Sequence, residues 1–210
     1  MIRAVLFDYG GVITEGMAGL LIPLTEGSGA TLPEIGALLL GAYHEDGDYM
    51  WHRLERGEVT FQATCAWARD EASQRGWTLD LSPLPRLLAE LPLRPGMIDR
   101  IRALRAEGIR TGLVTNNVRE FGVSWKTQLA FDELFDVVVD SCETGLRKPD
   151  RRIYELALER LGTKAEDAVF LDDFTVNVEG ARRVGMQAIL VGDDWRAAVA
   201  ELDAILGAEG

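Results

Sequence analysis

The chain has 210 residues, of which 47% are hydrophobic and 27% charged, and its formal net charge is -12. This length and composition allow a full hydrophobic core, so they exclude a disordered protein and favour one globular domain with room for an inserted subdomain. The acidic balance argues against a nucleic-acid partner, because nucleic-acid surfaces need a basic stripe. No apolar run reaches the roughly 18 residues of a membrane span. The first residues lead directly into a predicted strand rather than a signal peptide, so we expect a cytoplasmic protein with no membrane partner.

The predicted strands are short apolar segments, several of them rich in β-branched residues. They cover residues 4–7, 111–114, 137–139, 168–171 and 188–191. Helices are predicted over residues 97–107 and 151–161, because apolar side chains recur there at helical spacing. Gly108 and Gly162 follow these two segments, and glycine is the commonest residue just past a helix end. Strands that alternate with helices predict a parallel α/β sheet.

The pattern changes between Thr14 and Leu93, where no strong strand appears. Helical segments are separated there by breakers such as Gly27-Ser28-Gly29, Gly57 and Pro83. We therefore predict a helical insertion after the first strand, which divides the chain into residues 1–14 and 94–210 on one side and residues 15–93 on the other.

The tryptophans of the insertion, Trp51, Trp67 and Trp77, are expected to build its small core, with an aromatic wall over the sheet as the alternative. The two cysteines, Cys65 and Cys142, are far apart and in no metal-ligand spacing. We expect both to be reduced packing residues.

Polar side chains follow four of the predicted strands. They are Asp8 after the first strand, Thr115-Asn116-Asn117 after the second, Lys148-Pro149 beyond the third, and Asp172-Asp173 after the fourth. Because the carboxyl ends of parallel strands share one rim, we expect these groups to gather over a single crevice. A carboxylate can attack phosphorus, Thr, Asn and Lys can bind phosphoryl oxygens, and carboxylates can hold Mg²⁺. The pattern predicts a phosphoryl-transfer site.

These four groups of residues resemble the motifs of the haloacid dehalogenase (HAD) superfamily. They are nearest to the phosphatase branch that includes the amino-terminal domain of soluble epoxide hydrolases. They read Asp8-Tyr9-Gly10-Gly11-Val12, Thr115-Asn116, Gly145-Leu146-Arg147-Lys148-Pro149-Asp150, and Phe170-Leu171-Asp172-Asp173 followed by Asn177 and Gly180. The resemblance covers nearly the whole chain. It implies a Rossmann-like three-layer core with a parallel sheet, a helical cap over residues 15–93, and Mg²⁺-dependent hydrolysis of a small phosphorylated metabolite through an aspartyl-phosphate.

The resemblance also implies a magnesium site. Asp8 would be both the nucleophile and a metal ligand, and the backbone carbonyl of Gly10 would be a second ligand. Asp173 would complete the protein ligands with Asp172 behind it, or these two roles would be exchanged.

Other residues would bind the phosphoryl group under the same resemblance. Thr115 and Lys148 would hold it, and Lys148 would lower the repulsion between Asp8 and an incoming dianion. The remaining candidates for phosphate contact or orientation are Gly10, Gly11, Asn116 and Asn177.

Gly10 departs from the superfamily pattern, in which phosphatases place an aspartate that protonates the leaving group and later deprotonates water. Losing such an acid/base costs on the order of 10²–10⁴ in rate. We therefore expect acyl, aryl or anomeric sugar phosphates, whose leaving groups have a low pKa, to suffer least. Glycine recurs at this position within the same branch, so a water or a cap residue could take over. The candidates on or near the insertion are Glu15, His44 and His52, although both histidines are also ordinary packing or surface residues.

Two other interpretations stay open. In a 2-haloacid dehalogenase-like hydrolase Asp8 would attack carbon without a metal; Gly10 is compatible with that branch, whereas the pair Asp172-Asp173 argues against it. In a catalytically impaired member, which Gly10 supports, the chain would bind phosphate, a metal or a protein without turnover. As ordinary structure, Asp172-Asp173 would cap the next helix, which accounts for one aspartate but not for both. The sequence is compatible with a monomer or a homodimer.

Overall fold

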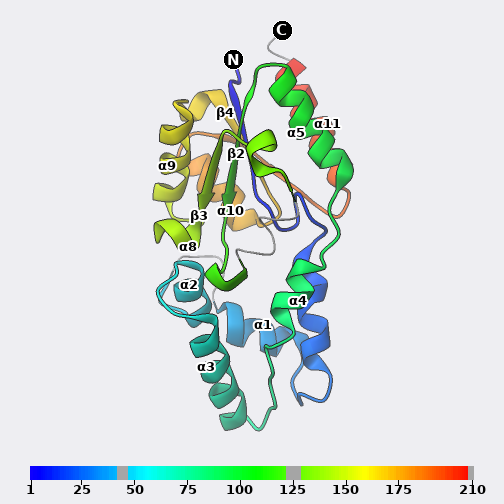
Figure 1. Ribbon diagram of the computed structural model, residues 1–210, viewed down its shortest axis with the longest axis vertical. Helices are drawn as coiled ribbons and strands as arrows, with labels where there is room; N and C mark the ends of the chain where they lie inside the picture. Colours follow the sequence, from blue (N-terminus) through cyan, green and yellow to red (C-terminus); the bar gives the residue numbers. More distant parts are fainter. Residues whose placement is uncertain (42–46, 122–128, 208–210) are drawn as a thin grey trace.

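The computed structural model describes residues 1–41, 47–121 and 129–207. Its centre is one sheet of five parallel strands in the order β3-β2-β1-β4-β5 (Figure 1). The strands are β1 (Ala4–Phe7), β2 (Arg110–Thr115), β3 (Val137–Asp140), β4 (Ala168–Asp172) and β5 (Gln187–Leu190). All five predicted strands are confirmed, each to within one residue at either end.

Helices cover both faces of the sheet, which gives three layers (Figure 1). Side chains alternate along β1, so that Val5 and Phe7 pack with α5 (Pro95–Ala106) and α11 (Trp195–Gly207). Ala4 and Leu6 pack on the other face with α9 (Arg151–Leu161) and α10 (Thr175–Arg183). A strand buried on both faces reads as a continuous apolar run, as expected of a central parallel strand.

The two helices predicted in the core are confirmed as α5 and α9. Gly108, beyond the end of α5, has φ +83°, and Gly162, at the end of α9, has φ +59°. Both are left-handed conformations that glycine adopts without steric cost. Short elements complete the core: η2 (Arg119–Phe121), α7 (Phe131–Leu134), α8 (Ser141–Thr144) and η3 (Ala165–Asp167).

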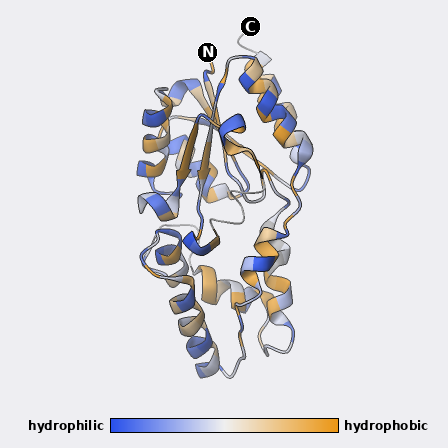
Figure 2. Cartoon of the chain, viewed as in Figure 1, coloured by the Kyte–Doolittle hydropathy of each residue, from blue (hydrophilic) through white to orange (hydrophobic). Residues whose placement is uncertain are grey.

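The helical insertion lies beyond the carboxyl ends of the strands (Figure 1). It contains η1 (Met17–Thr25), α1 (Leu32–Leu40), α2 (Met50–Glu55), α3 (Phe61–Gln74) and α4 (Leu84–Ala89). Its buried cluster includes Ile35 and Leu39 of α1, and Figure 2 shows the hydrophobic colour of that helix. The tryptophans Trp51, Trp67 and Trp77 pack against this cluster, as predicted. The insertion therefore has a hydrophobic core of its own.

The two connections between the insertion and the sheet run side by side. Thr14 and Leu93 form an antiparallel bridge, and the Arg94 amide donates to the Ile13 carbonyl at 2.7 Å. We propose this pairing as the boundary between a core of residues 1–14 and 94–210 and a cap of residues 15–93.

Within the described ranges, no helix combines the length and apolar character that a membrane crossing requires. Cys65 and Cys142 are both free thiols.

Candidate active site

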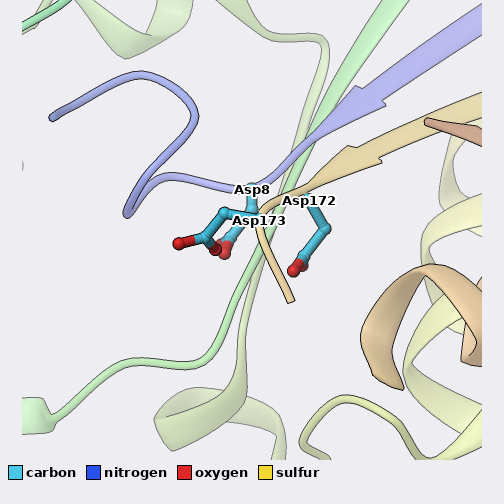
Figure 3. A group of neighbouring side chains, drawn as sticks. All are labelled: Asp8, Asp172 and Asp173. Carbon is cyan, nitrogen blue, oxygen red and sulfur yellow. The ribbon is translucent and has the colours of Figure 1, made fainter. Parts of the chain in front are cut away.

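Three carboxylates meet at the carboxyl ends of β1 and β4, which are neighbours in the sheet. Asp8 directly follows β1, Asp172 is the last residue of β4, and Asp173 follows it. Each contributes one oxygen to a group whose members lie within 4.8 Å of one another. Figure 3 shows the three side chains leaving the strand ends on the same side. A cluster of hard oxygen atoms at this spacing can hold a divalent cation.

Lys148 lies among these carboxylates. Its Nζ is 2.8 Å from Asp8 Oδ1 and 2.6 Å from Asp172 Oδ2, and its side chain is fully buried. Asn116 holds the lysine backbone, because the Lys148 amide donates to Asn116 Oδ1 at 2.8 Å and Asn116 Nδ2 donates to the Lys148 carbonyl at 3.1 Å. Asn116 therefore fixes the lysine from the end of β2.

The two neighbouring aspartates have different surroundings. Asp172 accepts hydrogen bonds from Lys148, from the Phe174 amide at 2.8 Å, and from Asn177 Nδ2 at 3.0 and 3.1 Å. Asp173 Oδ1 is buried and has no hydrogen-bond partner. A buried acceptor without a donor is costly unless something else supplies positive charge. The geometry therefore favours Asp173 as the metal ligand and Asp172 as the residue that orients Lys148 and Asn177.

Burial sets the protonation of the cluster. It raises the pKa of Asp8 from 3.8 to about 7, despite the opposing attraction of Lys148. Burial, together with the Asp8 and Asp172 carboxylates, raises the pKa of Asp173 to about 8. Burial disfavours the charge of Lys148, but Asp172 and Asp8 outweigh it and raise the pKa of the lysine. The site therefore contains a cationic lysine, and further positive charge would stabilise the ionised carboxylates of Asp8 and Asp173.

Gly11 lets the loop after β1 approach Asp173. It has φ +68°, and a Cβ at this position would collide with the Asp173 carboxylate. Arg94 holds the loop in place, because its Nη1 donates to the Gly11 carbonyl at 2.5 Å. Gly11 was predicted as a phosphate contact; the structure gives it a steric role beside the metal-binding candidate. Gly10 is not among the described glycines with positive φ, so its backbone conformation is open to other residues.

A cavity of about 360 Å³ lies between the strand ends and the cap. Most of its polar lining comes from the strand ends, the loops beyond them and the start of α10: Asp8, Gly10, Thr115, Asn116, Lys148, Asp173 and Asn177. The structure thus brings these predicted site residues to one cavity, with Asp172 buried behind them. Its apolar lining comes mainly from the cap, with leucines of η1, α1 and α4 and with Trp51 of α2. The alternative role considered for Trp51, an aromatic wall, is therefore present beside its packing role.

Of the predicted substitutes for an acid/base at residue 10, the two that the structure describes, Glu15 and His52, do not line this cavity. Glu15 is half exposed and pairs with Arg94, 3.1 Å from Nη2 to Oε2. His52 is fully buried in the cap, where its Nδ1 accepts from the Gly47 amide at 3.1 Å and its ring packs edge-on against Tyr49. His44 lies outside the described residues.

The sequence did not point to Glu55, which lines the cavity from α2. Its carboxylate is buried and accepts from Arg147 Nε at 2.7 Å and from Trp51 Nε1 at 3.1 Å. Arg147 belongs to the core and is fully buried. The two partners are 92 residues apart in the chain, so local spacing carries no signal for this pair.

Three relatives resemble the chain over nearly its full length. The Acyl-CoA dehydrogenase family member 10 of Mus musculus is 33% identical over 98% of this chain and 19% of its own length. The Bifunctional epoxide hydrolase 2 of Rattus norvegicus is 29% identical over 99% of this chain and 39% of its own length. The chain therefore spans well under half of these two proteins. The Sesquiterpene phosphatase astK of Aspergillus oryzae is 27% identical over 91% of this chain and 90% of its own length.

A solved structure shares the fold. It is a HAD family enzyme from Bacteroides thetaiotaomicron, in complex with magnesium and inorganic phosphate, with a TM-score of 0.61 and 19% identity. The alignment covers 92% of this chain and 96% of that one. The family model of haloacid dehalogenase-like hydrolases matches residues 2–185. With the sheet, the strand-end residues and this match in agreement, the chain belongs to the haloacid dehalogenase-like hydrolase family.

Proposed function

We propose that this protein is a Mg²⁺-dependent phosphatase that transfers a phosphoryl group from a small monophosphate to Asp8 and then to water. The observation that carries the proposal is the buried Asp8–Lys148–Asp172 arrangement beside Asp173, whose Oδ1 lacks a hydrogen-bond partner. The phosphatase name of the Aspergillus oryzae relative, which matches over nearly its full length, supports the same conclusion.

In the first step an Asp8 carboxylate oxygen attacks phosphorus and the bond to the leaving group breaks. The Tyr9 amide donates to Asp8 Oδ1 at 2.7 Å, and Lys148 contacts the same atom, so the carboxylate is held in one orientation. The Thr115 hydroxyl, the Asn116 amide and the Lys148 ammonium group are the donors available to the phosphoryl oxygens at this rim. Such fixed donors stabilise the charge that develops in the transition state.

The donor set suits magnesium, which prefers oxygen ligands and few protein carboxylates. Asp8, Asp173 and the carbonyl of Gly10 would hold the ion, and Asp172 would orient Lys148 beside it. When bound, Mg²⁺ neutralises charge on the phosphoryl group and on the two carboxylates.

The cap suggests the kind of substrate. Leu21, Leu39, Leu40, Leu84, Leu88 and Trp51 form its part of the cavity wall. In the described part of the chain, the one charged side chain that lines the cavity from the cap is Glu55, which is paired with Arg147. Such a wall favours an apolar or aromatic organic group over a polyhydroxylated one, because hydroxyl groups would lose their hydrogen bonds to water. Together with Gly10, this favours aryl and other activated phosphates.

The test is release of inorganic phosphate from an aryl phosphate with and without Mg²⁺. We expect release that needs Mg²⁺ and is abolished by Asp8→Asn, which keeps the size of the side chain but cannot attack. Absence of release from aryl, acyl and alkyl phosphates at saturating substrate would refute the phosphatase. Halide release from a 2-haloacid without Mg²⁺ would instead support the dehalogenase alternative.

A further inference from the structure

A small pocket lies beside the phosphoryl cavity, next to the position where residue 10 has no side chain. Its volume is about 80 Å³. One water occupies about 30 Å³ in the liquid, so the pocket has room for roughly two or three. Gly10, Glu55 and Thr115 line both this pocket and the larger cavity. A water held here would therefore lie next to the phosphoryl position.

Among the described residues, two titratable side chains line this small pocket: Tyr9 and Glu55. Burial raises the pKa of Tyr9 to about 12, so its phenol keeps its proton at neutral pH and is already a donor. The carboxylate of Glu55 has the acceptor character that a base needs. It is the one carboxylate of this lining, and it comes from the cap rather than from the four strand-end motifs.

Two side chains hold the Glu55 carboxylate by hydrogen bonds. Arg147 faces it from the core and Trp51 from the preceding turn of α2, and both donate to its carboxylate. Two other charged groups of this region have partners of their own: Arg56 binds Glu58, and Arg119 donates to the Cys142 carbonyl at 2.8 Å. These two hydrogen bonds hold the Glu55 carboxylate in place as an acceptor, which suits a base rather than an acid.

We propose that Glu55 is the general base for the second half of the reaction, the hydrolysis of the phosphoryl group on Asp8. The oxygen of a water in the small pocket forms a bond to phosphorus, and the bond from phosphorus to the Asp8 oxygen breaks. The electron pair of that bond returns to the Asp8 carboxylate. The water proton passes to Glu55 and then to the released phosphate or to solvent.

This inference rests on the proposed function, but it makes a separate statement. Glu55 replaces one of the two tasks of the missing aspartate, deprotonation of water. It does not replace protonation of the leaving group, because Arg147 and Trp51 both donate to its carboxylate and hold it as a hydrogen-bond acceptor. The two half-reactions can therefore be tested independently.

The test measures the release of a light-absorbing phenol from an aryl phosphate, starting with the first turnover. In Glu55→Gln we expect a burst of one phenol per chain, followed by slow steady turnover. The steady rate should be reduced on the order of 10²–10⁴-fold relative to the unmodified chain. Phosphorylated Asp8 should accumulate. Gly10→Asp in the same chain should restore steady turnover.

A matched variant distinguishes a catalytic role of Glu55 from a structural role, in which its ion pair with Arg147 only holds the cap on the core. Arg147→Met breaks the same ion pair but keeps the Glu55 carboxylate, so hydrolysis of phosphorylated Asp8 should persist. If the ion pair were purely structural, both substitutions would reduce turnover equally. Glu15→Gln, outside the cavity, should change neither phase.

The double variant Glu55→Gln/Arg147→Met removes both buried charges and decides the matter if Glu55→Gln alone does not fold. A normal steady rate in a folded variant without Glu55 would overturn the inference. A loss of burst and steady turnover to the same extent would also overturn it. If the unmodified chain shows no Mg²⁺-dependent burst with any activated phosphate, the proposed function itself fails.

Discussion

At the level of single residues, the contrast between Asp172 and Asp173 shows how two identical side chains acquire different tasks. Asp172 is saturated by Lys148, Asn177 and the Phe174 amide, whereas Asp173 has a buried oxygen without a donor. The sequence predicted that both belong to the site, because they follow a strand. It could not assign their roles, because these depend on which donors the fold brings near.

The raised pKa values of Asp8 and Asp173 predict a pH-dependent response to magnesium. Both pKa values rise from 3.8, to about 7 and about 8, so between about pH 4 and pH 8 the folded metal-free protein binds more protons than the unfolded chain. The free energy of unfolding of the metal-free protein therefore falls as pH rises through this window. In the proposed site Mg²⁺ would bind the deprotonated carboxylates, so we expect it to raise the melting temperature more at pH 8 than at pH 6.

Melting curves with and without Mg²⁺ at the two pH values check this. Asp173→Asn is the control, since it removes one of the two titrating ligands and should reduce both the shift and its pH dependence. The same shift at both pH values in the unmodified chain would contradict the raised pKa values.

Restoring the missing acid predicts a selective gain. Gly10→Asp should raise turnover of alkyl phosphates more than that of aryl phosphates, because alkoxides need protonation as they leave and phenolates need it less. The φ angle at residue 10 does not require glycine. The check is kcat for a matched alkyl and aryl pair. Equal gains for both classes would argue against a missing acid.

At the level of secondary-structure elements, the cap helices supply most of the apolar wall of the cavity over the strand ends. Leu40 at the end of α1 lines the cavity, whereas Leu32 at the start of the same helix does not and is 37% exposed. The structure thus offers one leucine in the cavity and a matched leucine outside it.

Leu40→Gln should weaken recognition of an apolar substrate. We expect kcat/KM for an extended aryl phosphate to fall about fivefold, which corresponds to roughly 1 kcal/mol of lost apolar contact. Acetyl phosphate, which is too small to reach the wall, should be affected little, and Leu32→Gln should leave both substrates unchanged. An equal loss for both substrates in Leu40→Gln would point to a general disturbance of the cap rather than to a substrate contact.

At the level of the whole molecule, the core could be predicted because each part of it has a local signal. Apolar strands, the glycines after α5 and α9, and the polar residues after the strands all follow from spacing and residue type. The contact between cap and core has no such signal. Glu55 pairs with Arg147, and the Ser141 hydroxyl donates to the Glu55 carbonyl at 2.6 Å, across 92 and 86 residues of chain.

The lack of a local signal also explains why the sequence favours Glu15 and His52 as substitutes for the missing acid/base. Their residue type and their place in the insertion indicate such a role. In the fold, however, Glu15 pairs with Arg94 and His52 packs against Tyr49. Side-chain direction within a small helical cap depends on packing against the sheet. That information enters with the tertiary structure.

The central claim is that Asp8 carries the phosphoryl group. The most direct measurement is peptide mass spectrometry of the protein quenched in acid during turnover of an aryl phosphate with Mg²⁺. We predict a single phosphoryl group on the peptide that contains Asp8, absent without Mg²⁺ and absent in Asp8→Asn. Turnover that proceeds with no phosphorylation of Asp8, or phosphorylation that persists in Asp8→Asn, would contradict the account.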